Sequence, residues 1–205
     1  MVLTAQKFFI YRTILITRIL YIHGFNSSPE SMKAALTSAY IAKHFPDVVF
    51  HCPQVASSPK LAIEQLDIIL ASHPNDNWLL IGSSLGGYFC TYFAEKYSLP
   101  AVLINPAVKP FLLLSDYIGQ QTNPYTNEKY FVEPEHMDYL KALEIEKISQ
   151  KNYLVMVQTG DEVLDYRQAV EKYQQCQLIV QEGGDHSFIN FEQMLPDIAN
   201  FLHLT

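Results

Sequence analysis

The sequence predicts an α/β fold with a mostly parallel, doubly wound sheet and helices on both faces. Short apolar runs alternate with helix-like stretches, a pattern typical of parallel strands joined by crossover helices. The segments of greatest chemical interest each follow an apolar run, as expected where ligands bind beyond the carboxyl ends of parallel strands. We expect strands near residues 18–22, 48–52, 77–82, 101–105, 152–158 and 177–182, and helices near 30–44, 57–72, 85–97, 164–175 and 190–203.

Length and composition predict one globular domain. The chain has 205 residues, of which 49% are hydrophobic and 17% charged, a balance that excludes a largely disordered protein. The formal net charge is −7, and the basic residues form no cluster. Since binding to a phosphate backbone requires clustered lysine or arginine, we expect no nucleic-acid partner.

The cysteines predict a reducing compartment. Cys52, Cys90 and Cys176 are odd in number and far apart, which argues against a disulfide framework and for the cytoplasm. His51 and Cys52 are the only histidine and cysteine that are adjacent in sequence, and we interpret them as packing at a strand end. We therefore expect no metal site.

Residues 1–17 form an extension in front of a single domain over residues 18–205. Their apolar residues are interrupted by Lys7 and Arg12, so the segment is too short and too charged to span a membrane. An extra edge strand, a tail of little structure and a start site assigned too early are all compatible with this segment.

A G-x-S-x-G pattern occupies residues 82–86 and places a candidate nucleophile, Ser84, at its centre. An apolar run precedes the pattern and a helix-like stretch follows it, which is the context of a nucleophile elbow. The pattern occurs often by chance when this context is missing. Ser83 is the neighbouring alternative, but it does not occupy the central position.

His186 is the candidate base for this serine. A serine hydroxyl is a poor nucleophile at neutral pH unless a base within hydrogen-bond distance accepts its proton. His186 lies on a loop between the apolar run 178–180 and a C-terminal helix, where it is expected to reach the end of the sheet. The alternative is a surface histidine capped by Ser187.

Asp161 is the candidate residue for orienting the imidazole and balancing its charge. It follows the apolar run 153–157, and the resulting order of serine, aspartate and histidine is the one known for α/β-hydrolases. Glu162 and Asp185 are alternatives. Asp165 has the sequence context of an N-cap for the helix that follows it.

Two backbone amides are the candidates for binding an oxyanion. One is the amide of Leu85, directly after the nucleophile, and the other is that of Phe25, in the loop after the strand 18–22. Gly24 permits the backbone to bend beside Phe25. We expect His23 to have a structural role, in which its side chain anchors the loop.

Residues 106–150 are too long for a simple connection, and we interpret them as a small helical cap over the site. The segment is rich in aromatic and aliphatic residues and is interrupted by prolines. Its apolar side chains could line a pocket for an acyl group or could close the core, and the sequence favours neither.

Five segments together resemble the YqiA-type esterases, a family of small bacterial α/β-hydrolases. The resemblance extends from about Ile19 to the C-terminus, whereas members of that family usually lack an extension such as residues 1–17. It implies an α/β-hydrolase fold and cleavage of acyl esters or thioesters. It also implies the roles given above for Ser84, Asp161 and His186. The segments are residues 21–29, 82–88, 105–108, 158–165 and 183–188.

The expected function is therefore that of a serine esterase or thioesterase. It would act on a small-molecule acyl ester or thioester through an acyl-enzyme, without a cofactor or metal. A non-catalytic binding module with the same fold, and an acyltransferase with the same triad, are the alternatives. The sequence gives no indication of the oligomeric state.

Overall fold

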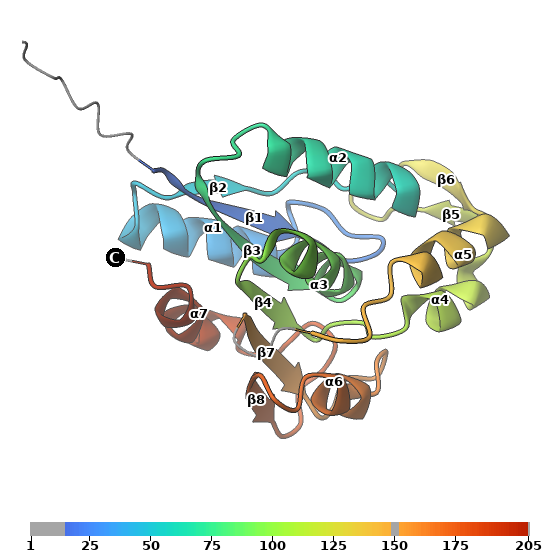
Figure 1. The fold of residues 1–205 in the computed structure, drawn as a ribbon. Helices are drawn as coiled ribbons and strands as arrows, with labels where there is room; N and C mark the ends of the chain where they lie inside the picture. The colour runs from blue at the N-terminus through green and yellow to red at the C-terminus, as the bar shows by residue number, and fades with distance from the viewer. Residues whose placement is uncertain (1–14, 149–151, 205) are drawn as a thin grey trace, which may run out of the picture.

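A parallel sheet of six strands lies at the centre of the computed structural model, which describes residues 15–148 and 152–204 (Figure 1). The strand order is β2-β1-β3-β4-β7-β8, and every pair of neighbours is parallel. The predicted doubly wound α/β fold is thus confirmed. The strands are β1 (Thr17–Ile22), β2 (Val49–His51), β3 (Asn77–Ser83), β4 (Ala101–Ile104), β7 (Tyr153–Gln158) and β8 (Gln177–Gln181).

The central strands consist of nearly continuous apolar sequence because both of their faces are buried. All residues of β4 and β7 are buried, and so are five of the six residues of β1. The edge strands β2 and β8 are only partly buried, and β8 begins and ends with a glutamine.

Helices cover both faces of the sheet (Figure 1). One face packs against α2 (Pro59–Ala71), α3 (Leu85–Tyr97) and α6 (Tyr166–Lys172). The other packs against α1 (Met32–His44), the 3-10 helix η2 (Phe191–Met194) and α7 (Leu195–Phe201). Helix α6 ends three residues before its predicted end, because Tyr173 begins a turn in which its carbonyl accepts a hydrogen bond from the amide of Cys176.

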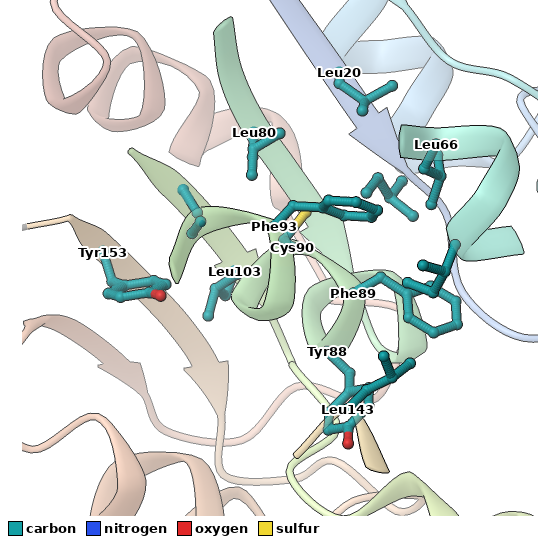
Figure 2. Packing of buried hydrophobic residues seen from close by; sticks show 14 of the residues in the cluster. Leu20, Leu66, Leu80, Tyr88, Phe89, Cys90, Phe93, Leu103, Leu143 and Tyr153 are labelled. Carbon is teal, nitrogen blue, oxygen red and sulfur yellow. The ribbon is translucent and has the colours of Figure 1, made fainter. Parts of the chain in front are cut away.

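The larger part of the core lies around α3. Figure 2 shows Phe89, Cys90 and Phe93 of this helix among side chains of the sheet and Leu66 of α2. All four are almost completely buried. Since α3 follows Ser84 directly, this packing holds the start of the helix, and with it the turn at Ser84, firmly against the sheet.

The interval between β4 and β7 contains the predicted helices and also a two-stranded hairpin. The hairpin was not predicted because its strands, β5 and β6, are only four residues long and partly exposed, and because β5 is polar. The division into an extension (1–17), a domain (18–205) and a cap (106–150) stays a prediction. The elements of the interval are α4 (Pro110–Leu113), η1 (Leu114–Tyr117), β5 (Gly119–Thr122), β6 (Lys129–Val132) and α5 (Pro134–Ala142).

The start of the chain is described only from residue 15. Most of the predicted extension, residues 1–14, lies outside the described residues. The last residue of that extension, Thr17, is the first residue of β1. Within residues 15–148 and 152–204, no helix is long and apolar enough to cross a membrane.

The contact between α3 and β1 requires a glycine, which leads to a first prediction. A Cβ atom at Gly86 would overlap the backbone carbonyl oxygen of Ile22, and backbone cannot move aside as a flexible side chain can. We expect Gly86→Ala to lower the free energy of unfolding by about 3 kcal/mol, measured by urea denaturation. This loss should exceed the gain of about 1 kcal/mol that alanine brings to a helix interior.

Gly87→Ala is the matched control, since Gly87 lies in the same turn of α3. There the closest atom is the side-chain Cβ of Pro106, at 2.8 Å from the added carbon. The loss should therefore be smaller than for Gly86→Ala. Equal stability of the two variants would contradict the importance of the contact with β1.

Candidate active site

Ser84 occupies a strained turn between β3 and α3. Its backbone has φ 55° and ψ −122°, a conformation that residues other than glycine rarely adopt. The turn is held from both sides, because the Ser84 amide donates to the carbonyl of Ile104 and the Ser84 carbonyl accepts from the amides of Gly87 and Ala107. The side chain is thereby presented at the carboxyl end of the sheet, as expected for a nucleophile elbow.

His186 lies between Ser84 and Asp161. Its Nε2 is 3.1 Å from Ser84 Oγ, and its Nδ1 is 2.8 Å from Asp161 Oδ2 and 3.0 Å from Oδ1. A carboxylate only accepts hydrogen bonds, so the proton of the neutral ring belongs on Nδ1. Nε2 is then free to accept the proton of the serine hydroxyl.

Asp161 is held as a charged carboxylate. Its side chain is only 1% exposed, and Oδ1 also accepts the amides of Val163 and Leu164, at 2.9 and 2.8 Å. Burial alone would raise its pKa. The hydrogen bonds from His186 and the two amides, together with the charge of His186, outweigh burial and lower the pKa.

The other acidic residues near the site make different contacts. Asp165 caps α6 by accepting the amide of Arg167, as its sequence context predicts. Asp185 accepts the hydroxyl of Ser187, and Glu162 accepts the backbone amide of His186 at 3.0 Å. The structure therefore brings Asp161, and none of these alternatives, to the imidazole ring. The catalytic roles of Ser84, Asp161 and His186 stay predictions at this point.

The loop after β1 approaches the serine closely. A Cβ atom at Gly24 would lie 3.1 Å from Ser84 Cβ, so a side chain there would crowd the turn. His23 anchors this loop, since its Nε2 accepts the amide of Val55 and its Nδ1 donates to the carbonyl of Gly24, both at 3.0 Å. Burial lowers the pKa of His23, against the opposing effect of the Gly24 carbonyl, and favours the neutral ring.

The hairpin β5–β6 is tied to the same loop. Tyr130 donates to Asn26 Oδ1 at 2.7 Å, and the buried Asn123 donates through Nδ2 to the carbonyl of Ser27 at 2.9 Å. These contacts place the hairpin, which belongs to the interval where we expected a cap, beside the loop that approaches the serine.

A cavity of about 230 Å³ opens beside Ser84 and His186. Its walls are mainly apolar and include side chains from α4 and η1, so part of the interval 106–150 lines the site. Two further cavities, of about 280 and 610 Å³, lie beyond it along α4. The cavity of 280 Å³ shares lining residues with the one beside Ser84, and the cavity of 610 Å³ shares lining residues with that of 280 Å³. The residues lining the first cavity are Phe25, Asn26, Ser84, Leu85, Ala107, Pro110, Leu113, Leu114, Tyr117, Val163 and His186.

Sequence reasoning missed two buried amides behind the site, Asn105 and Gln158. Each lies at the carboxyl end of a central strand and is only 3% exposed. The available signal was a polar residue at the end of each of two apolar runs, 101–104 and 153–157. No group of three or more histidine, cysteine, aspartate or glutamate residues in the described part of the chain is placed to hold a metal ion.

Solved structures with a similar fold cover most of the chain. Est1E from Butyrivibrio proteoclasticus has a TM-score of 0.73 at 14% identity, over 92% of this chain and 88% of that chain. Mouse alpha/beta hydrolase domain-containing protein 10 has a TM-score of 0.74 at 15% identity, over 91% and 89%. A monoacylglycerol lipase from Paleococcus ferrophilus has a TM-score of 0.64 at 15% identity, over 90% and 93%. At this level of identity the likeness establishes the α/β-hydrolase fold.

The sequence also matches relatives over nearly its whole length. A UPF0227 protein from Citrobacter koseri is 23% identical over 188 residues, which are 89% of this chain and 97% of that protein. The protein YcfP from Salmonella arizonae matches to the same extent. The model of the uncharacterised protein family UPF0227 matches residues 18–203. The predicted resemblance to YqiA-type proteins is thus confirmed, and the chain belongs to the UPF0227 family.

Proposed function

We propose that this protein is a serine hydrolase that cleaves acyl esters or thioesters. The observation that carries the proposal is the unbroken chain of hydrogen bonds from Ser84 through His186 to Asp161. These residues are 102 and 25 positions apart in sequence, yet they meet at one edge of the sheet with the nucleophile, base and orienting acid in the order that catalysis needs. The monoacylglycerol lipase among the structural neighbours agrees with this function.

The geometry supports a two-step reaction. Ser84 Oγ attacks the carbonyl carbon of the substrate while its proton passes to His186 Nε2. His186 then donates that proton to the departing alcohol or thiol, which leaves an acyl group on Ser84. A water molecule attacks the acyl carbon by the same route, and the acid is released. Asp161 keeps the ring oriented and stabilises it when it is charged.

The backbone amides of Phe25 and Leu85 are the proposed donors to the oxyanion. Both residues line the cavity that contains Ser84 and His186. Among the hydrogen bonds of residues 15–148 and 152–204, neither amide is already used as a donor. Removal of one such donor typically lowers the rate about 10²–10³-fold, so the position of the loop after β1 matters for catalysis.

The cavity walls favour an apolar acyl group. Leu113 and Val163 border both the cavity beside Ser84 and the next one along α4, so a long acyl chain could pass between them. All three cysteines are free, which agrees with the expected cytoplasmic location. No cofactor is needed for these steps.

Replacement of the nucleophile is the direct test. We expect Ser84→Ala to lower kcat for a p-nitrophenyl ester by up to about 10⁶-fold. A fluorophosphonate probe should label Ser84 in the unaltered protein, as detected by mass spectrometry of peptides. Ser83→Ala is the matched control, because Ser83 belongs to β3 and should be dispensable for the reaction.

Residual hydrolysis, probe labelling and product analysis with an added alcohol separate the alternatives. Hydrolysis that survives Ser84→Ala would rule out the mechanism, and an unlabelled serine would indicate a binding module. If an added alcohol accepts the acyl group more readily than water does, the protein is an acyltransferase with the same triad.

Activity should depend on pH in one direction. A protonated imidazole cannot accept the serine proton, and histidine side chains ordinarily become protonated near pH 6.5. The pKa of Asp161 is lowered below the ordinary value for aspartate, so its carboxylate stays charged between pH 5 and 8. We therefore expect kcat to fall as the pH is lowered from 8 to 5. A flat profile over this range would contradict the role of His186.

A bulky side chain between the first two cavities should change chain-length preference. We expect Leu113→Trp to leave acetyl and butyryl esters as substrates and to lower kcat/KM for octanoyl and longer esters about tenfold or more. Ile118→Trp is the control, since Ile118 is 43% exposed and lines neither cavity. Equal loss for short and long esters would show that acyl chains do not follow this path.

A further inference from the structure

The loop that carries His186, residues 182–190, belongs to no helix or strand, so no regular ladder of backbone hydrogen bonds fixes it. Gly183 and Gly184 both have φ 75°, and Phe188 and Asn190 have φ 66° and 61°. Glycine adopts positive φ readily, but other residues seldom do, so Phe188 and Asn190 hold the loop in a conformation that an isolated chain would rarely adopt. Other groups must therefore fix it.

Gln158 is the first of these groups. Its Oε1 accepts the amides of Asp185 and Ile189, at 3.1 and 2.8 Å. Its Nε2 donates to the carbonyl of Ile189 at 2.8 Å and to Gln181 Oε1 at 2.9 Å. All four hydrogen-bonding positions of this amide are used, and Gly184 packs so closely that a Cβ atom there would overlap Oε1.

Asn105 is the second group, at the end of the neighbouring strand. Its Nδ2 donates to the carbonyls of Asp185 and His186, at 3.1 and 3.3 Å. Its Oδ1 accepts the backbone amide of Gln158 at 3.0 Å. The two side chains therefore belong to one network, which binds backbone groups of Asp185, His186 and Ile189.

The orientation of both amides follows from their partners. Each side-chain oxygen faces backbone N–H groups, which can only donate, and each NH₂ group faces at least one carbonyl, which can only accept. If either side-chain amide were rotated by 180°, its NH₂ group would face backbone N–H groups and its oxygen would face carbonyl oxygens. The network therefore has one arrangement.

We propose that Asn105 and Gln158 are positioning residues, which hold the backbone around His186 so that its ring stays aligned between Asp161 and Ser84. The inference rests on the proposed hydrolase function. Neither residue lines the cavity beside Ser84, so both act through the loop. A displacement of a catalytic group by about 1 Å can cost about 10²-fold in rate, which sets the size of the expected effect.

Asn105→Asp tests the proposal with almost no change of shape. The new carboxylate oxygen would face the two carbonyl oxygens that Nδ2 now binds. We expect kcat to fall about 10²-fold while KM stays within about threefold, because the group is remote from the cavity. The proton NMR signal of His186 Nδ1–H, which its short hydrogen bond to Asp161 should shift far downfield, is expected to weaken or move.

Gln158→Glu is the second variant, because Asn105→Asp could fail to fold. It keeps an acceptor for Asp185 and Ile189 and removes the donor to the Ile189 carbonyl. Thr91→Val is the matched control, since Thr91 is also a buried polar residue, at 1% exposed. Its hydroxyl bonds the Gly87 carbonyl within α3 and the hydroxyl of Tyr173, and it makes no hydrogen bond to the His186 loop. This control variant should lower thermal stability and leave kcat and the Nδ1–H signal unchanged.

The outcomes are distinct. Folded Asn105→Asp or Gln158→Glu proteins that, like Thr91→Val, lose only stability would overturn the positioning role. The NMR signal does not require turnover, so it tests the alignment of the ring independently of the substrate. Hydrolysis that survives Ser84→Ala would instead refute the proposed function.

Discussion

The hydrogen bonds of one imidazole connect the parts of this molecule that matter for its chemistry. His186 reaches Ser84 through Nε2 and Asp161 through Nδ1, and both contacts exist only because three strands end at the same edge of the sheet. The serine follows β3, the aspartate follows β7 and the histidine follows β8. In a parallel sheet these ends point the same way, so long crossovers can bring residues far apart in sequence to one edge.

Close backbone approach is the second condition. Helix α3 lies so near β1 that Gly86 has no room for a methyl group, and a Cβ atom at Gly24 would be only 3.1 Å from Ser84 Cβ. These contacts bring the Phe25 loop and the start of α3 together around the left-handed Ser84. Strain at Ser84 is tolerated because the buried core around Phe89 and Phe93 and the backbone hydrogen bonds of the turn hold it in place.

The histidine loop depends on buried amides in a comparable way. Its backbone groups are bound by side chains from the ends of β4 and β7, with further contacts from Glu162 and from Lys33, which donates to the Ser187 carbonyl. Such a loop keeps a shape that local sequence preferences would not select. Side chains at the strand ends thus provide hydrogen-bond partners for the backbone of this loop, as neighbouring strands do within the sheet.

Apolar runs and their order were sufficient to predict the sheet, its crossovers and the placement of Ser84, Asp161 and His186 after strands, because burial on both faces imposes a readable pattern on parallel strands. Pairwise contacts were not predictable in the same way. Three sets of contacts depend on distances between segments remote along the chain. Asp161, rather than Glu162 or Asp185, reaches the ring. Asn105 and Gln158 bind the histidine loop, and the hairpin β5–β6 binds the Phe25 loop. Those distances arise from packing in three dimensions, and no local pattern of residues records them.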